Sequence, residues 1–211
     1  MKYKLLVFDL DGTLIDTRED LAAAVNEMRS YYELPSLPLQ EVVSYVGDGA
    51  RKLVERSLQG CDVDLDQALE RMLSAYRQNI CVFSKVFEGC RDFIQNMRRQ
   101  GVKMAVLTNK PQLMTDMILK ELELYHYFNP VFGPEGAGCH KPDPAGLLKC
   151  LELNNCSKSE SLMIGDHHTD LRVAQNAGVA KAFYTGGMGR ADGVQAEITF
   201  NSYEELTGLV S

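Results

Sequence analysis

The fold is decided by residues 8–14, FDLDGTL. A continuous apolar run at residues 5–8 leads into this stretch and stops at Asp9, which is followed two residues later by Asp11. Similar, largely apolar runs occupy residues 102–107, 161–164 and 180–184, and each stops at polar or glycine residues. Short runs of this kind are typical of strands that are buried on both faces of a parallel sheet. Because amphipathic segments separate the later runs, the sequence predicts an α/β fold with helices packed on a parallel sheet.

Residues 16–85 break this alternation, because they contain no clear strand pattern. Thr17 and Asp20 have the spacing of a helix cap, and they precede apolar residues at helical intervals. Further helical segments are expected after Pro38 and around residues 65–76. An all-helical block inserted after the first strand indicates a second, smaller domain.

The expected domain boundaries follow from this break in the pattern. We expect an α/β core formed by residues 1–15 and 86–211, and a helical domain formed by residues 16–85. A chain of 211 residues, 45% of them hydrophobic, is long enough for one domain that carries such an insert.

Charge and composition exclude several classes of partner. The 22 basic and 29 acidic residues give a net charge of −7, and an acidic surface cannot neutralise the phosphates of nucleic acid or anionic lipid. No run approaches the ~18 apolar residues of a membrane span, and the N-terminal apolar run is too short for a signal peptide. The six cysteines form no pair with zinc-ligand spacing. We therefore expect a cytoplasmic monomer or homodimer that binds neither nucleic acid nor membranes.

Polar side chains stand where the expected strands end. Ligands of open parallel sheets bind outside the carboxyl ends of the strands, so these side chains should share one crevice. The set comprises Asp9, Asp11, Thr108, Asn109, Asp166 and Asp170. Each member also suits a turn or a helix cap by itself. Their joint placement at successive strand ends favours a functional site.

The acids in this set limit the chemistry of the site. Carboxylates repel one another unless a cation lies among them, and oxygen ligands favour a hard cation such as Mg²⁺, which often shares its coordination with a substrate phosphate. A carboxylate can attack phosphorus to form an aspartyl-phosphate, while a second carboxyl protonates the leaving oxygen and later activates water. Lys141 and the Thr108 hydroxyl can offset charge on the phosphoryl oxygens. The expected substrate is a small phosphorylated metabolite.

The chain resembles the haloacid dehalogenase superfamily along nearly its whole length. Residues 8–14 resemble the opening motif of that superfamily. Residues 107–109, 141–143 and 165–170 are similar to its second, third and fourth motifs, in the right order. The helical block resembles the cap of phosphoglycolate-phosphatase-like members. The resemblance implies a Rossmann-like core with the cap closing over the site.

The resemblance also implies catalytic roles. Asp9 corresponds to the nucleophile and Asp11 to the general acid and base. Thr108 and Lys141 correspond to the groups that hold the transferring phosphoryl group, with Asn109 beside it.

The same resemblance implies a magnesium site. Asp9, the backbone carbonyl of Asp11 and Asp166 correspond to ligands of Mg²⁺. Asp170 corresponds to a ligand that acts directly or through water. The histidines at residues 167–168 lie between two of these acids. They are either contacts to metal or substrate, or loop residues that cap the following helix, and we favour the cap.

Related activities remain as alternatives. Asp11 favours phosphoryl transfer, because dehalogenases of the superfamily lack this second acid. Related phosphomutases carry a histidine early in the first cap helix, where Leu21 stands here. Related phosphonate hydrolases carry a Schiff-base lysine where we align Ala50, with Lys52 nearby. From another class, the chain can be a catalytically silent regulator that binds metal or phosphate, which the complete acid set disfavours.

The choice of substrate is the least constrained feature. Glycine-flanked helix N-termini bind anions, so we expect Gly49 and Arg51, with Lys52, to hold the substrate end remote from the phosphate. A plain break between helices explains the same residues equally well. Phosphoglycolate is the first substrate that the resemblance suggests, with pyrophosphate, sugar phosphates and nucleoside monophosphates as alternatives.

Overall fold

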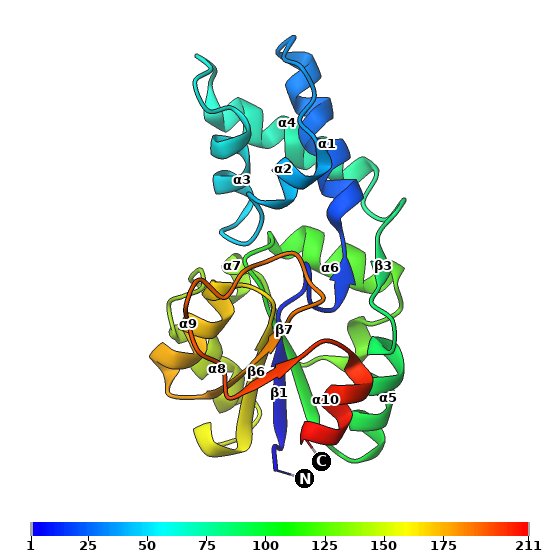
Figure 1. The fold of residues 1–211 in the computed structure, drawn as a ribbon, viewed down its shortest axis with the longest axis vertical. Helices are drawn as coiled ribbons and strands as arrows, with labels where there is room; N and C mark the ends of the chain where they lie inside the picture. The colour runs from blue at the N-terminus through cyan, green and yellow to red at the C-terminus, as the bar shows by residue number, and fades with distance from the viewer. Residues whose placement is uncertain (1, 211) are drawn as a thin grey trace.

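A computed structural model describes residues 2–210 and contains a six-stranded sheet in the order β5-β4-β1-β6-β7-β8. All five pairings in this sheet are parallel, which confirms the predicted α/β fold (Figure 1). The strands are β1 (Leu5–Phe8), β4 (Lys103–Leu107), β5 (Val131–Phe132), β6 (Ser161–Gly165), β7 (Ala180–Tyr184) and β8 (Ile198–Phe200).

Helices cover both faces of the sheet. They are α5 (Cys90–Arg99), α6 (Gln112–Glu121), α7 (Pro134–Ala137), α8 (Ala145–Leu153), α9 (His168–Ala177) and α10 (Tyr203–Val210), with short 3₁₀ helices at Tyr125–Tyr127 and Lys158–Glu160. Alternate residues of β1 point to opposite faces. Leu6 and Phe8 pack with α5, α6 and α10, whereas Leu5 and Val7 pack with α8 and α9. This double burial explains why the strand is apolar at every position.

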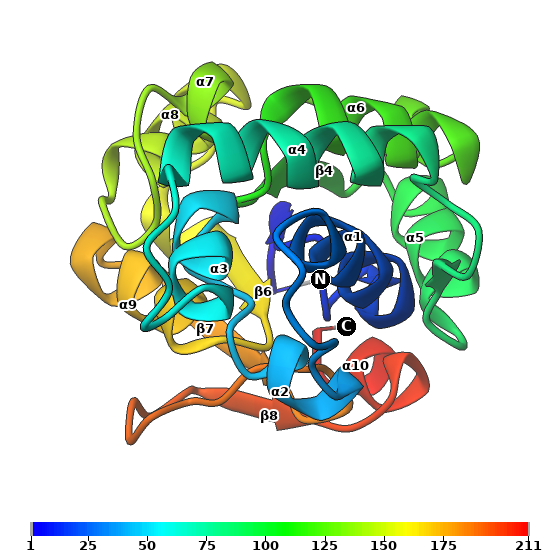
Figure 2. The same cartoon turned by 90° about the horizontal axis from the view of Figure 1, so that it is seen from above.

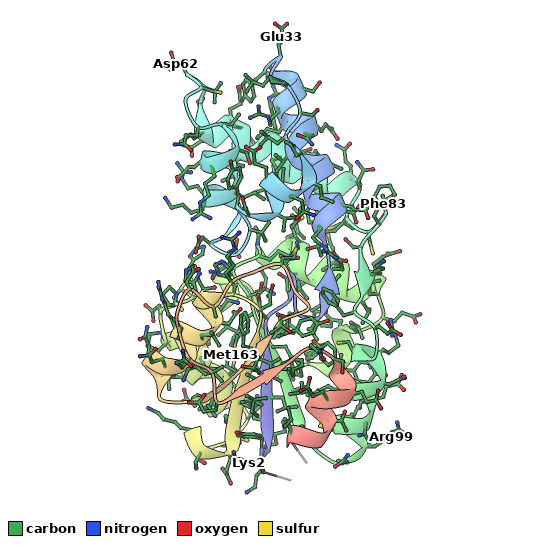
Figure 3. The ribbon with its side chains drawn as sticks, viewed as in Figure 1. Lys2, Glu33, Asp62, Phe83, Arg99 and Met163 are labelled. Atoms are coloured by element: carbon green, nitrogen blue, oxygen red, sulfur yellow. The ribbon has the colours of Figure 1, made fainter. Side chains whose placement is uncertain are left out.

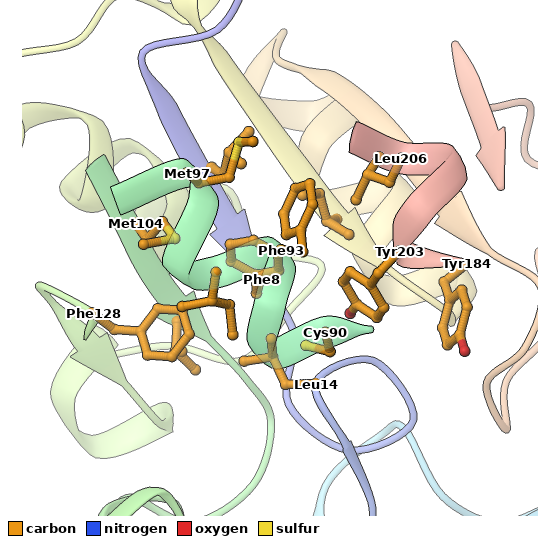
Figure 4. Packing of buried hydrophobic residues seen from close by; sticks show 14 of the residues in the cluster. Phe8, Leu14, Cys90, Phe93, Met97, Met104, Phe128, Tyr184, Tyr203 and Leu206 are labelled. Atoms are coloured by element: carbon orange, nitrogen blue, oxygen red, sulfur yellow. The ribbon is translucent and has the colours of Figure 1, made fainter. Parts of the chain in front are cut away.

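Aromatic side chains fill the layer under α5 and α10 (Figure 4). The ring centroids of Phe8 and Phe93 lie 6.3 Å apart in an edge-on arrangement, and Phe93 in turn packs against Tyr203. The Tyr203 hydroxyl donates a hydrogen bond of 2.8 Å to the backbone carbonyl of Thr13. The core is thereby tied to the loop that follows β1, where the acids of the site lie.

A helical block stands over the carboxyl ends of the strands (Figures 1 and 2). It contains α1 (Arg18–Tyr31), α2 (Leu39–Val43), α3 (Ala50–Ser57) and α4 (Leu65–Gln78). These helices share a hydrophobic cluster of their own, which Met114 of α6 joins from below. Glu33 and Asp62 mark the far end of the block, and Lys2 and Arg99 mark the opposite end of the molecule (Figure 3). We propose that residues 16–85 form a cap on a core of residues 1–15 and 86–211.

Two short strands join the cap to the core, in a block that the sequence predicted to be free of strands. Strand β2 (Ile15–Asp16) pairs antiparallel with β3 (Lys85–Val86). Thr17 is the N-cap residue of α1, as predicted, but neither Thr17 nor Asp20 caps the helix through its side chain, because both side chains have other partners. The Thr17 hydroxyl donates to Asp11, and the Asp20 carboxylate accepts hydrogen bonds from the returning linker at residues 83–84.

Within residues 2–210, no helix is both long and apolar enough to cross a membrane.

Candidate active site

The predicted site residues meet where the strand order reverses. Strand β1 lies between β4 and β6, and later strands extend the sheet outward on either side. The crevice at such a reversal is where open α/β sheets bind ligands. Asp9 follows β1, Thr108 follows β4, and Asp166 follows β6. All three line one cavity between the sheet and the cap.

Three buried acids surround one point at the bottom of this crevice. Carboxylate oxygens of Asp9, Asp166 and Asp170 lie within 4.8 Å of one another. Gly12 makes room for them, because a Cβ there would lie 2.2 Å from Asp166 Oδ2, and its φ of +81° suits glycine. Thr13 Oγ1 donates to Asp166 Oδ1 at 3.0 Å. The geometry thus fixes the carboxylate of Asp166 and faces it toward Asp9.

The loop after β7 also holds Asp166. The backbone N–H groups of Met188 and Gly189 donate to Asp166 Oδ2 at 2.7 and 2.8 Å. This loop belongs to the candidate site, since both residues line the cavity.

The acids are poised for a cation. Burial and the neighbouring Asp170 carboxylate raise the pKa of Asp9 to about 6, although Lys141 opposes the shift. Burial and the carboxylates of Asp9 and Asp170 raise the pKa of Asp166 to about 7, against the backbone hydrogen bonds it accepts. A cation among the three would relieve this repulsion. Since every donor is a carboxylate oxygen, the residues fit a hard cation such as Mg²⁺.

Lys141 lies behind the acids and does not line the cavity. Its Nζ is 2.6 Å from Asp170 Oδ1 and 2.7 Å from Asp9 Oδ1. The Asp9 contact is an ion pair without hydrogen-bond alignment, because that oxygen has no hydrogen-bond partner. Burial alone would lower the pKa of Lys141, but the two acids outweigh it and raise the pKa. Lys141 therefore stays charged beside the predicted nucleophile.

Asn109 fixes Lys141 in place. Its Oδ1 accepts a hydrogen bond of 2.8 Å from the backbone N–H of Lys141, and its Nδ2 donates to the carbonyl of the same residue at 3.1 Å. The second Nδ2 donor goes to the carbonyl of Gly47 in the cap, also at 3.1 Å. With its amide so engaged, Asn109 acts as a positioning residue in this state. Thr108 keeps its hydroxyl proton for another acceptor, since its oxygen accepts from Lys110 N–H.

Asp11 has partners that the sequence analysis missed. Lys110 Nζ lies 3.0 Å from Asp11 Oδ1 and 2.8 Å from the hydroxyl of Tyr76 in the cap. The Thr17 hydroxyl donates to Asp11 Oδ1 at 2.8 Å. The position of Lys110 directly after Thr108 and Asn109 was the available signal, but Tyr76 has no local pattern that links it to the site.

The predicted cap residues separate in the structure. Gly49 lines the cavity near the backbone of Asn109, as expected for a residue that faces substrate. Arg51 is not among the residues that line this cavity, and its expected role in substrate binding stays a prediction. Its guanidinium points to the start of α4, where it pairs with Asp66 at 2.6 Å. Lys52 likewise pairs with Glu55 on an exposed face.

The two histidines have structural partners. His167 Nδ1 caps α9 by accepting from the backbone N–H of Thr169, and the ring packs under Gly47 of the cap. Burial and the adjacent His168 lower the pKa of His167 to about 4. His168 lies 3.2 Å from Asp192. The helix cap that we favoured is therefore present.

Comparison with known proteins agrees with this architecture. A sequence model of the family described as haloacid dehalogenase-like hydrolase matches residues 6–183. A phosphoglycolate phosphatase of Pseudomonas putida is 36% identical over 214 residues, covering 98% of this chain and 78% of the relative. Phosphoglycolate phosphatase 1 of Pseudomonas aeruginosa is 35% identical and covers 87% of this chain and 70% of its own length.

Solved structures show the same fold. The crystal structure of a predicted phosphoglycolate phosphatase from Haemophilus somnus superposes with a TM-score of 0.95 at 24% identity, covering 100% of this chain and 99% of the other. A putative phosphoglycolate phosphatase from Lactobacillus delbrueckii superposes with a TM-score of 0.86 at 22% identity, again covering 100% and 99%. The family match over residues 6–183 and the 36% identity to a relative that is covered over 78% of its length together show that the chain belongs to the haloacid dehalogenase-like hydrolase family.

Proposed function

We propose that this phosphatase is magnesium-dependent and hydrolyses a small phosphorylated metabolite through an aspartyl-phosphate on Asp9. The observation that carries the proposal is the position of Asp9, which lines the cavity and is flanked by two buried acids and the ammonium of Lys141. A carboxylate held in this way faces a ligand in the cavity. The neighbouring lysine can offset the negative charge of the carboxylate and of a phosphoryl group, and the neighbouring acids can hold a cation.

The proposed reaction has two displacements at phosphorus. An oxygen of Asp9 attacks the phosphorus while the bond to the leaving oxygen breaks, and Asp11 gives its proton to that oxygen. Asp11 then takes a proton from a water molecule that attacks the aspartyl-phosphate, which releases inorganic phosphate and frees Asp9. The Thr108 hydroxyl donates to a phosphoryl oxygen, and Lys141 offsets the negative charge next to Asp9.

Magnesium fits the acids as a resident cation. Asp9 and Asp166 would ligate it, together with the backbone carbonyl of Asp11, and Asp170 would ligate it directly or through water. When bound, Mg²⁺ would supply positive charge that offsets both the carboxylates and the phosphoryl oxygens. The hydrogen bonds that Asp166 accepts from Thr13 and from the loop after β7 fix its carboxylate, which supports this role.

Phosphoglycolate is the proposed substrate, because the similar Pseudomonas proteins carry that activity in their names. Cap side chains disfavour the alternative activities. Leu21, at the place of the mutase histidine, lies in the cavity wall, as does Ala50, at the place of the phosphonatase lysine. Lys52 is paired with Glu55 on the outside of α3.

The test is phosphate release from phosphoglycolate, a sugar phosphate, a nucleoside monophosphate and pyrophosphate, each with Mg²⁺ or EDTA. We expect Mg²⁺-dependent release that is highest on phosphoglycolate and is lost in Asp9→Asn. The melting temperature of the variant should equal or exceed that of the wild type, because a repelling acid is removed. Acid quenching during turnover should trap phosphate on the peptide that contains Asp9. Release that persists in Asp9→Asn would refute the mechanism.

A further inference from the structure

Lys110 is the one lysine or arginine among the described residues that line the cavity. Its side chain is only 3% exposed, so its charge is directed into the protein rather than into solvent. Burial by itself would lower the pKa of Lys110, but Asp11 and Tyr76 outweigh it and raise the pKa. The site therefore contains a permanent positive charge that the proposed chemistry at Asp9 does not use.

The ammonium group of Lys110 bridges the core and the cap. Its Nζ donates to both carboxylate oxygens of Asp11, at 3.0 and 3.2 Å, and to the Tyr76 hydroxyl at 2.8 Å. It also lies 4.3 Å from the centre of the Tyr76 ring. Burial raises the pKa of Tyr76 to about 12, so its hydroxyl keeps a proton to donate. An incoming anion can replace one of the two Asp11 contacts without leaving Nζ short of acceptors.

We propose that Lys110, assisted by the Tyr76 hydroxyl, binds a carboxylate on the leaving group of the substrate and so selects small phosphorylated carboxylic acids. This inference rests on the proposed function, in which Asp11 lies beside the leaving oxygen. Lys110 Nζ is hydrogen-bonded to the Asp11 carboxylate, so it lies one hydrogen-bond length from the group that protonates the leaving oxygen. In phosphoglycolate, the carboxylate carbon is two bonds from the leaving oxygen, so the anion falls next to Nζ. Lys110 thus takes the role that the sequence suggested for Arg51.

The rest of the cavity wall agrees with a small substrate of this kind. From the cap and α6, the wall is formed largely by the apolar side chains of Leu21, Val46, Leu53, Met72, Leu73 and Met114. Such side chains offer no hydrogen bonds to the hydroxyls of a sugar, and burying those hydroxyls without partners is costly. A short carbon chain that ends in a carboxylate suits both the wall and the ammonium group.

The test compares two substrates that differ only in the carboxylate. Phosphoglycolate and ethyl phosphate share the same length of chain, but ethyl phosphate ends in a methyl group. In Lys110→Met, the ratio of kcat/KM for phosphoglycolate to kcat/KM for ethyl phosphate should fall by about 100-fold, since a buried charged hydrogen bond is lost. Lys158→Met is the matched control, because Lys158 is exposed and does not line the cavity, and it should leave the ratio unchanged.

Other outcomes overturn the inference. An equal loss on both substrates would mean that Lys110 acts through Asp11 rather than on the carboxylate, and no loss would mean that it does not contact substrate. If Lys110→Met does not fold, Tyr76→Phe replaces it and should lower the same ratio by about tenfold.

A binding measurement separates this inference from the proposed function. If the wild type releases no phosphate from either compound, the proposed function fails, and calorimetry then measures binding of the two compounds to wild type and Lys110→Met. If phosphoglycolate binds more tightly than ethyl phosphate to the wild type but not to Lys110→Met, the inference is supported even though the proposed function has failed. Equal binding of both compounds to the wild type would overturn it.

Discussion

The core and the cap line the same cavity with side chains of opposite character. The core supplies Asp9, Asp11, Thr108 and Asp166 at the ends of rigid strands, whereas the cap supplies mainly aliphatic and methionine side chains. The polar groups that need exact placement follow the strands of the sheet, and the apolar groups that shape the cavity and exclude water come from the helices of the cap. The difference teaches that changes to the acids at the strand ends should affect the chemical step, and changes to the cap face of the cavity should affect substrate binding.

The two buried lysines show the same contrast on a smaller scale. Lys141 contacts Asp9 and Asp170, which both belong to the core, so the charged partners of its ammonium group do not come from the cap. Lys110 contacts Asp11 of the core and Tyr76 of the cap, so its surroundings change when the cap moves. We therefore expect Lys141 to serve the reaction and Lys110 to serve recognition.

The largest effect is expected from Lys141→Met. We expect kcat to fall about a thousandfold, because the positive charge beside Asp9 is lost. KM should change much less, since Lys141 does not line the cavity. Lys149→Met is the control, because Lys149 lies on the exposed side of α8. Steady-state kinetics on both variants check this, and a change confined to KM would break the contrast between core and cap.

A smaller effect is expected from Gly47→Ala at the junction of the cap with the core. Gly47 has φ of +119°, and a Cβ there would lie 2.6 Å from the His167 ring. The cap should seat less well, so KM should rise about tenfold with little change in kcat. Gly60→Ala is the matched control, because Gly60 has φ of +83° and nothing within 4 Å of its Cβ position. If both variants change KM alike, the contact between Gly47 of the cap and His167 of the core does not govern substrate binding.

The smallest effect is expected in the thermal stability of metal-free protein. The pKa values of about 6 for Asp9 and 7 for Asp166 exceed the ordinary value of 3.8, so the folded state holds protons that the unfolded state has released. Stability is therefore present below about pH 4 and is lost as the pH rises through 6 and 7. With EDTA, the melting temperature should fall by roughly 5 °C between pH 5 and 8, and Mg²⁺ should reverse the fall.

Asp166→Asn isolates this contribution. The lowered pKa of His167, about 4, works in the opposite direction below its ordinary value of 6.5, because its unfolded state takes up the proton. The variant retains His167 but lacks one of the two raised acids, so its melting temperature with EDTA should fall less at high pH. An identical pH profile for variant and wild type would show that the acids are not strained without metal.

The sheet and the acid cluster were predictable from the sequence because their signals are local. Strand β1 is a run of apolar residues that ends at Asp9, and β6 is another that ends at Asp166. Once parallel strands are expected, the topology itself brings their carboxyl ends together. The site therefore followed from sequence order without knowledge of any side-chain contact.

Other features were not predictable, because they depend on partners distant in the sequence or on very short elements. Strands β5 and β8 contain two and three residues, which is too few to show a period. The role of Lys110 depends on Tyr76, which is 34 residues away in the cap. The direction of the Arg51 side chain was not predictable either, because a basic helix start does not reveal which way a side chain turns, and here Arg51 pairs with Asp66.

The pairing of β2 with β3 makes the cap an insertion with a single point of attachment to the core. The chain leaves the core at Ile15 and returns at Val86, and these two residues are partners in the same small sheet. With respect to the core, the cap is a long loop whose two ends are held together by β2 and β3. The entropic cost of closing such a loop rises only slowly with its length. A block of another size can occupy this junction without shifting the register of β1 against β4. The cap can therefore change in size or sequence while the acids at the ends of β1 and β6 and the core residue Lys110 keep their places.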